Sequence, residues 1–358
     1  MAKLYGREYT KEELLRRVGD IFQVAGVRLA RLDDGNELGT RVADLRTGSG
    51  FAFTVLLDRG MDIGPAELWG MALGWRSATM AAAPAFFEPE GRGFLRTFHG
   101  GLLCTCGLTY MGAPCTDEGK ELGLHGRVSH IPATNVWADG KWEGDDYVFW
   151  VQGKVRETAV FQENLLLTRR IWARLGESRL FIEDVVENQG YERTPHMVLY
   201  HCNFGFPVVD EGTELIGPIK RTEPRDDAAS PGLEKCRVMD APTAGYKEQV
   251  FFHEMEADAE GMVTAALVNR SLCTGYPLAL YVRYRQKELP CFTQWKMMGQ
   301  GTYVVGLEPG NSLPMGRDKE RAAGRLKFLE PGERVEYFLE IGALTSPEEI
   351  EKLEKASK

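Results

Sequence analysis

The sequence has no long apolar run and no excess of positive charge. No segment approaches the roughly 20 apolar residues that a membrane-spanning helix needs, and the charged start of the chain lacks the apolar core of a signal peptide. The chain holds 43 Lys and Arg against 52 Asp and Glu, a formal net charge of −9, which argues against a nucleic-acid surface. We therefore expect a cytoplasmic protein that binds neither membranes nor nucleic acids.

Several common catalytic motifs are also missing. There is no Gly-x-Gly-x-x-Gly after a strand, no P-loop and no Gly-x-Ser-x-Gly elbow, so nucleotide-dependent and serine-hydrolase chemistry have no support. The seven cysteines are an odd number, and reduced thiols are the expected state in a cytoplasmic protein.

What the sequence does contain is a long series of strand-like segments separated by Gly and Pro. Helix signals occur only near the two ends, as a capping box from Thr10 to Glu13 and as a Ser346-Pro347 start. We find no repeat and no linker, so many short strands predict one antiparallel sandwich or barrel domain over residues 1–358. The main predicted strands cover residues 51–57, 147–155, 165–172, 179–186, 263–268, 278–284, 303–307 and 335–341.

Two polar side chains stand near the ends of predicted strands and are candidates for acid–base catalysis. Alternation along one strand places His201 and Asn203 on the same face, and along another it places Gly306 and Glu308 on one face. The small Gly306 leaves space where a ring could lie. An imidazole and a carboxyl group can work as a proton donor and acceptor near neutral pH. The alternatives are a core histidine bonded to a carbonyl and a glutamate that points into water.

Further candidates could bind a sugar. His125 and Arg127 flank a glycine and offer hydrogen-bond donors for hydroxyl groups or an anionic substituent, and His99 lies in a similar His-Gly-Gly segment. On the segment from residue 292 to 296, Gln294 and Lys296 share one face, and Trp295 lies on the other. Trp295 is either a stacking platform for a sugar or an anchor in the core.

A metal site is a further alternative. Four side chains could form one, and the conceivable ligand set is His99, His125, His201 and Glu308. The spacing of Cys104 and Cys106 is too short for a zinc knuckle, and no His-Glu-x-x-His is present. We therefore expect no metal.

With these residues in place, the chain resembles the aldose 1-epimerase (galactose mutarotase-like) superfamily. The matching pieces occur in the family's order: Leu124-His125-Gly126, the strands from Ile182 through Pro195 to Phe204, and Gly306-Leu307-Glu308. The resemblance implies an all-β fold, a large antiparallel β-supersandwich with a concave sugar-binding face, here with short helices at the termini.

The resemblance also implies an activity, the interconversion of sugar anomers by ring opening. His201 would be the general acid, Glu308 the general base, and His125 would orient the sugar near its ring oxygen. No cofactor is implied. The chain departs from the family in having Tyr200 before the histidine and Pro309 after the glutamate. The acidic residue that binds hexose hydroxyls has no clear counterpart, and the candidates are Asp226 and Asp227.

We therefore expect a mutarotase or epimerase that acts on a monosaccharide, either unmodified or carrying an anionic group. A homodimer is a further expectation. The alternatives are a carbohydrate-binding protein without catalysis and a metal-dependent sugar isomerase or lyase.

Overall fold

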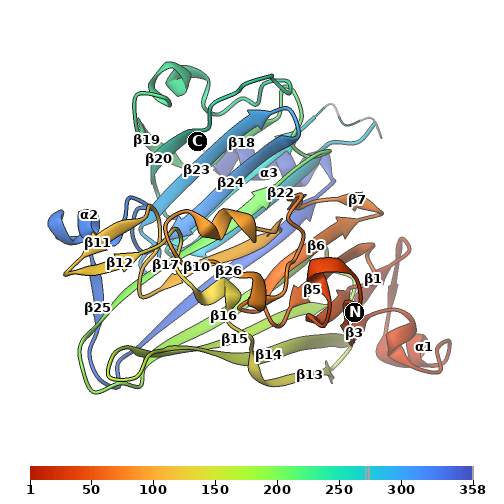
Figure 1. Cartoon of the computed structure of the whole chain (residues 1–358). Coiled ribbons are helices and arrows are strands. Elements are labelled where there is room, and N and C mark those ends of the chain that lie inside the picture. Colours follow the sequence, from red (N-terminus) through yellow and green to blue (C-terminus); the bar gives the residue numbers. More distant parts are fainter. Residues whose placement is uncertain (271, 273–274, 357–358) are drawn as a thin grey trace.

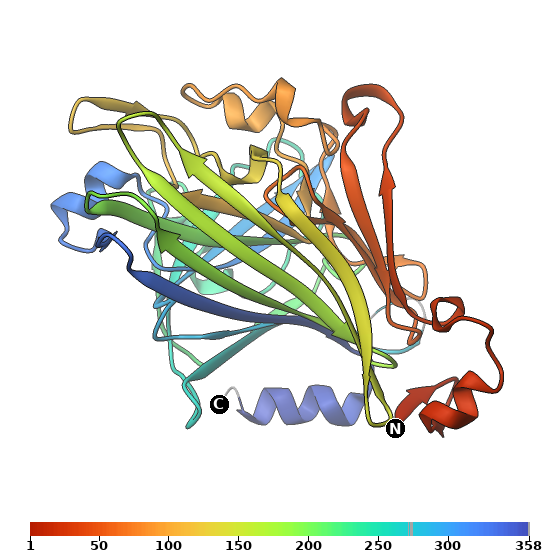
Figure 2. The same cartoon turned by 90° about the horizontal axis from the view of Figure 1, so that it is seen from below.

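The protein is built from two large antiparallel β-sheets that face each other and enclose the core (Figures 1 and 2). The computed structural model describes residues 1–270, 272 and 275–356. Within these residues the first sheet has twelve strands and the second has eight. The strands of the second sheet, in spatial order, are β13 (Thr134–Glu143), β14 (Asp146–Thr158), β15 (Asn164–Arg174), β16 (Arg179–Asn188), β26 (Arg334–Leu344), β22 (Leu278–Arg285), β21 (Met262–Asn269) and β18 (Glu214–Ile216).

The twelve-stranded sheet carries the candidate site on its outer face. Two of its strands are short additions, since β25 (Lys327–Leu329) pairs with β17 and β7 (Met71–Ala72) pairs with β6. The other ten, in spatial order, are β19 (Ile219–Pro224), β20 (Gln249–Met255), β23 (Cys291–Gly299), β24 (Thr302–Gly310), β17 (Thr194–Phe204), β10 (Leu103–Leu108), β6 (Asp62–Leu68), β5 (Phe51–Leu56), β4 (Arg41–Arg46) and β3 (Gly26–Arg31).

Short elements lie outside the two large sheets. Three two-stranded sheets are β1 (Ala2–Leu4) with β2 (Arg7–Tyr9), β8 (Trp75–Arg76) with β9 (Gly100–Gly101), and β11 (Cys115–Asp117) with β12 (Lys120–Leu122). The turns around η3 (Pro84–Phe86) and η4 (Gly93–Arg96), together with the β11–β12 hairpin, lie in front of the larger sheet in Figure 1. Of these segments, η4 contributes Phe94 and Leu95 to the site, and Pro114 and Leu124 on either side of the hairpin also line it.

The helices confirm the predicted start signals. Helix α1 (Lys11–Leu15) begins with the full capping box of Thr10 and Glu13. Helix α3 (Pro347–Ala356) starts at its proline. Helix α2 (Arg317–Ala322) was not predicted, because its sequence has no apolar stripe. None of the helices in the described ranges is long and apolar enough to cross a membrane.

The period-two prediction for the central strands is confirmed. On β17, Tyr200 and Cys202 face the core, and on β24, Leu307 does so. His201 and Glu308 consequently lie on the other face of the same sheet. The six described cysteines are free, while Cys273 is outside the described residues.

A buried ionic cluster fixes the central strands from the core side. The Arg169 guanidinium donates to both carboxylate oxygens of Asp184, at 2.9 and 2.7 Å, and to Thr105 Oγ1 at 2.9 Å. It also lies 3.3 Å from Asp62, a carboxyl group whose pKa is raised to about 6 by burial, although Arg169 opposes the shift. Tyr200 donates to Asp184 at 2.7 Å. The residue before His201 therefore anchors β17 to the opposite sheet.

Replacing Arg169 by Met is expected to lower the free energy of unfolding by about 3–5 kcal/mol, because it leaves two buried carboxyl groups without their cation. Urea unfolding monitored by circular dichroism measures the effect. Arg170→Met is the matched control, since Arg170 lies on the outer face of β15 over Trp150, at 4.6 Å from the ring. We expect a loss of about 1 kcal/mol or less there. Equal losses in the two variants would contradict the role assigned to the cluster.

Candidate active site

The register of two neighbouring strands brings His201 and Glu308 together. Strands β17 and β24 pair Leu199 with Gly310 and Cys202 with Leu307, which places the two polar residues opposite each other. Their side chains lie on the outer face, with His201 Nε2 3.2 Å from Glu308 Oε1. The two groups that the sequence analysis singled out, about a hundred residues apart, are therefore in contact.

These two side chains line a cavity of about 480 Å³. The sheet forms its floor, and the segment before β9, the region after β24, and the chain between β19 and β20 form its walls. Besides the pair, it is lined by Arg92, Phe94, Leu95, Phe98, Ala113, Pro114, Leu124, His125, Arg225, Asp226, Glu248, Val250, Thr293, Trp295, Pro314, Met315 and Lys319.

Burial favours the uncharged form of both groups. It lowers the pKa of His201 to about 3, with a further contribution from His125, and it raises the pKa of Glu308 well above its ordinary value, with Glu248 adding to the effect. Burial therefore opposes ionisation of both members of the pair.

Both groups also keep unused hydrogen-bonding capacity. Among the described residues, Nδ1 of His201 and Oε1 of Glu308 are buried and have no hydrogen-bond partner. The same is true of Nδ1 of His125 and Oγ1 of Thr293, which line the same cavity. A buried polar atom without a partner is costly, so this set of atoms is suited to a polar ligand.

Aromatic rings surround the imidazole of His201. The ring centres of Phe98, Trp295 and His125 lie 5.3, 5.5 and 5.7 Å from that of His201. Trp295 lines the cavity and is not a core anchor, and its Nε1 donates to Glu248 Oε2 at 3.0 Å. This wall supplies an apolar surface against which the C–H face of a sugar ring can pack.

His125 is held in the cavity by a constrained backbone. Its φ is +60°, a conformation that is uncommon for residues other than glycine. Its N–H donates to Gly112 and its carbonyl accepts from Gly107, at 2.9 and 3.1 Å. A Cβ on the following Gly126 would lie 2.3 Å from the Gly107 carbonyl oxygen, so only glycine fits there.

The space above Gly306 serves a different purpose from the one predicted. A Cβ on Gly306 would lie 2.3 Å from Glu308 Oε1, so the missing side chain makes room for the carboxyl group and not for a sugar ring.

Gly306→Ala is therefore expected to displace the Glu308 carboxyl group from His201. Displacements near 1 Å at a catalytic group cost on the order of 10²-fold in rate, and we expect a loss of that size in kcat for anomer exchange. NMR magnetisation-transfer rates measure the effect, and thermal unfolding controls for the fold. Unchanged kcat would contradict this role for Gly306.

Five residues predicted to bind substrate lie outside the cavity. Asn203 donates to the carbonyls of Gly100 and His201, at 3.1 and 2.8 Å, and is fully buried. Arg127 lines a neighbouring hollow of about 400 Å³. His99 lines a larger hollow on the same sheet, whereas His125, His201 and Glu308 line this cavity.

Gln294 and Lys296 lie outside the cavity for the same reason. Alternation places both on the face of β23 opposite Trp295, which lines the cavity. Gln294 bonds to His253 and to the Cys236 carbonyl at 2.9 and 2.7 Å. Lys296 is 1% exposed and binds Asp240 at 2.8 Å. Within the described ranges, no group of three or more His, Cys, Asp or Glu is arranged to hold a metal ion.

Sequence reasoning missed several residues of the site. Thr293 could have been found, since it shares the face of Trp295 on one strand. Arg92, Glu248 and Lys319 come from segments without a periodic pattern, and no local signal marks them. Of the two acidic candidates, Asp226 lines the cavity, and Asp227 is not among the lining residues.

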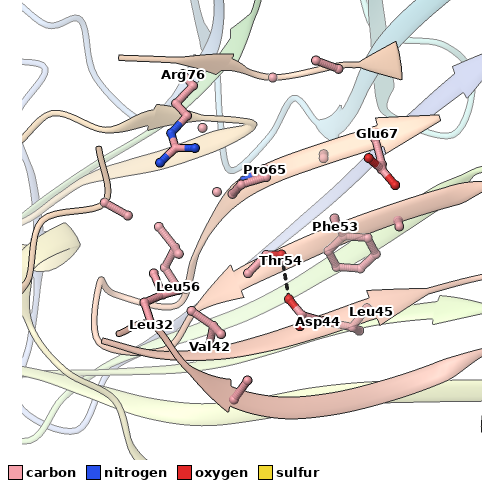
Figure 3. A pocket seen from close by; sticks show the side chains of 18 of the residues that line it. Leu32, Val42, Asp44, Leu45, Phe53, Thr54, Leu56, Pro65, Glu67 and Arg76 are labelled. Atoms are coloured by element: carbon pink, nitrogen blue, oxygen red, sulfur yellow. Dashed lines mark hydrogen bonds between the residues drawn. The ribbon is translucent and has the colours of Figure 1, made fainter. Parts of the chain in front are cut away.

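A larger hollow, of about 710 Å³, lies on the same sheet over β3 to β6 (Figure 3). Leu32, Val42 and Leu56 line it, and Thr54 donates to Asp44 at 2.9 Å within it. Its lining includes neither His201 nor Glu308. Among the described residues, the histidine–carboxylate contact lies in the smaller cavity, which is therefore the candidate active site.

Comparison with known proteins agrees with the fold. Residues 37–343 match the model of a family described as a domain of unknown function, DUF4432, and the chain belongs to this family. No curated protein matches the chain.

Solved structures show which fold this family adopts. A candidate aldose 1-epimerase from Klebsiella pneumoniae is 26% identical, with a TM-score of 0.87 over 97% of this chain and 89% of that one. A galactose mutarotase-like protein from Clostridium acetobutylicum is 13% identical, with a TM-score of 0.62 over 90% of this chain and 100% of that one. Galactose 1-epimerase from Lactobacillus acidophilus is 12% identical, with a TM-score of 0.59 over 90% and 99% of the two chains. The fold is galactose mutarotase-like, as the sequence resemblance implied.

Proposed function

We propose that this protein is an isomerase that interconverts the anomers of a monosaccharide by opening and closing its ring. The observation that carries the proposal is the 3.2 Å contact between His201 Nε2 and Glu308 Oε1 in a sugar-sized cavity. The aldose 1-epimerase names of structural relatives support the same class of reaction.

The contact distance suits the atoms that must react. In a cyclic hemiacetal, the ring oxygen and the anomeric hydroxyl oxygen are both bonded to C1, so they lie closer together than two hydrogen-bonded atoms. An acid for one oxygen and a base for the other can therefore act from neighbouring side chains. Each must also reach its oxygen at a hydrogen-bond distance of about 2.6–3.2 Å.

In the reaction, Glu308 as carboxylate accepts the proton of the anomeric hydroxyl, and His201 as imidazolium donates a proton to the ring oxygen. The C1–O5 bond breaks and a C1–O1 double bond forms. Rotation about C1–C2 then exposes the other face of the carbonyl. Reversal of both proton transfers closes the ring as the other anomer, and the protein returns to its starting state.

Binding of the sugar explains how His201 and Glu308 can become ionised. Sugar hydroxyls that hydrogen-bond to the carboxylate and the imidazolium favour the charged forms, which burial alone disfavours. His125 and Thr293 are placed to bind further hydroxyls of the ring, and Trp295 and Phe98 to pack against its apolar face.

Saturation-transfer NMR between anomers tests the proposal on a panel of aldoses and uronates. We expect exchange well above the spontaneous rate for at least one sugar, and unchanged exchange after dialysis against a chelator. Binding of sugars without any exchange would instead indicate a carbohydrate-binding protein. Loss of anomer exchange after dialysis against the chelator, with recovery when a divalent cation is added, would indicate a metal enzyme.

A further inference from the structure

The rim of the catalytic cavity carries two cations with no carboxylate partner. Arg92 lies just before η4, and Lys319 lies in α2, on two different segments that border the opening. Neither side chain forms an ion pair with another described residue, although most arginines of this chain do.

The third cation of the cavity is already neutralised. Arg225 binds Asp226 at 2.7 Å and Glu248 at 3.2 Å. The third carboxyl group of the lining, Glu308, is 2% exposed beside His201, and burial raises its pKa. Arg92 and Lys319 are therefore left as unpaired positive charges at the opening of the cavity, in a chain whose formal net charge is −9.

Arg92 acts on the interior of the cavity and not only on its edge. The pKa of His125 is lowered to about 4, by burial first and by the charge of Arg92 second. Phe94, two residues after Arg92, packs its ring 5.3 Å from that of His125. The guanidinium thus belongs to the segment that covers the sugar-orienting histidine.

We propose that the substrate carries an anionic group, a phosphate or a carboxylate, at a position away from its anomeric carbon, and that Arg92 and Lys319 bind this group. The inference rests on the proposed function and specifies its substrate class. Arginine binds either anion through two parallel hydrogen bonds, and lysine adds a point charge. The anomeric carbon lies at the His201–Glu308 pair, and the anion lies at the rim.

The test uses 1,5-anhydro sugars, which have no anomeric hydroxyl and cannot be turned over. Calorimetry measures the binding of the gluco, galacto and manno compounds in three forms, namely neutral, 6-phosphate and 6-carboxylate. We expect one anionic form in at least one configuration to bind roughly 10–100-fold more tightly than its neutral counterpart. The gain should shrink as salt is added, because the rim is exposed to solvent.

Two variants test whether Arg92 and Lys319 cause the tighter binding of the anionic compound. The double variant Arg92→Gln with Lys319→Gln should lose the anionic gain and keep the affinity for the neutral compound. Arg96→Gln is the matched control, since Arg96 is on the same turn and pairs with Glu88 at 3.1 Å. It should keep the gain. The comparison of the two anions identifies which group is preferred.

The outcomes separate this inference from the proposed function. Equal affinity for neutral and anionic forms in every configuration, or a gain that survives in the double variant, overturns the anion site. Anomer exchange on neutral sugars would then still support the mutarotase activity. Anionic binding that the double variant abolishes, with no anomer exchange on any sugar, retains the anion site and overturns the proposed reaction.

Discussion

Replacing Glu308 by Gln is expected to lower kcat/KM for anomer exchange by about 10²–10⁴-fold, the usual contribution of one positioned proton transfer. The amide has the size of the carboxyl group but cannot accept the proton of the anomeric hydroxyl. Glu308 is 2% exposed and burial raises its pKa, so the site disfavours a charged carboxylate and accommodates a neutral amide of the same size. The thermal stability should therefore change little.

His201→Asn should cause a loss of similar size, because it removes the group that protonates the ring oxygen. Glu183→Gln is the control, since Glu183 is an exposed carboxylate on β16 in the other sheet. Magnetisation-transfer rates for wild type and the three variants give the comparison. Full activity in both site variants would show that the reacting pair lies elsewhere.

The stability of the protein is expected to fall steeply as the pH drops below about 6. The pKa of each of the six histidines is lowered, chiefly by burial. The unfolded chain protonates these six imidazoles as the pH falls through about 6.5, while the folded chain leaves them neutral. A histidine whose pKa is lowered by folding stabilises the protein at pH values above the pKa that it has in the unfolded chain. This contribution is lost as the pH falls below that pKa.

Three buried carboxyl groups work in the opposite direction over part of this range. The pKa values of Asp62, Glu157 and Glu308 are raised by burial. Above about pH 4.5 these carboxyl groups hold at most three protons that the unfolded chain loses, whereas the unfolded chain gains up to six on its imidazoles. Each proton of the difference lowers the stability by about 1.4 kcal/mol per pH unit, so the effect of the histidines outweighs that of the carboxyl groups.

Urea midpoints measured at pH 7, 6, 5 and 4.5 test this expectation. His253→Gln offers a matched variant outside the cavity, since His253 bonds to Thr222 and Gln294 at 2.9 Å each. Its dependence on pH should be reduced by about one proton. A constant midpoint from pH 7 to 5 would contradict the assignment of neutral buried histidines.

The β architecture could be read from the sequence because alternation is a strong local signal. The predicted segment at residues 179–186 became part of β16 (Arg179–Asn188), and that at 335–341 became part of β26 (Arg334–Leu344). The division of the strands between two sheets was not predictable. Strands β16 and β26 are neighbours although they are far apart in the chain, and no local pattern specifies such a pairing.

The candidate site was predictable mainly where its residues lie on regular strands, while His125, in a turn, was named from its glycine-flanked segment and the family resemblance. His201, Glu308 and Trp295 were found because alternation places polar or aromatic groups on the outer face. Lys296 was predicted to bind the substrate, but it lies outside the cavity. Alternation correctly placed it on the strand face opposite Trp295, but alternation does not show which of the two faces borders a cavity. Arg92 comes from an irregular segment whose position depends on the whole fold.

The acid–base pair and the rim of the cavity differ in how they can change during evolution. His201 and Glu308 are set by the hydrogen-bonded register of β17 and β24, which tolerates no insertion. Arg92 and Lys319 come from segments that lie over the sheet and can vary in length and sequence. Under the proposed function, a change of substrate therefore needs only the exchange of these covering segments, while the pair on the sheet stays in place.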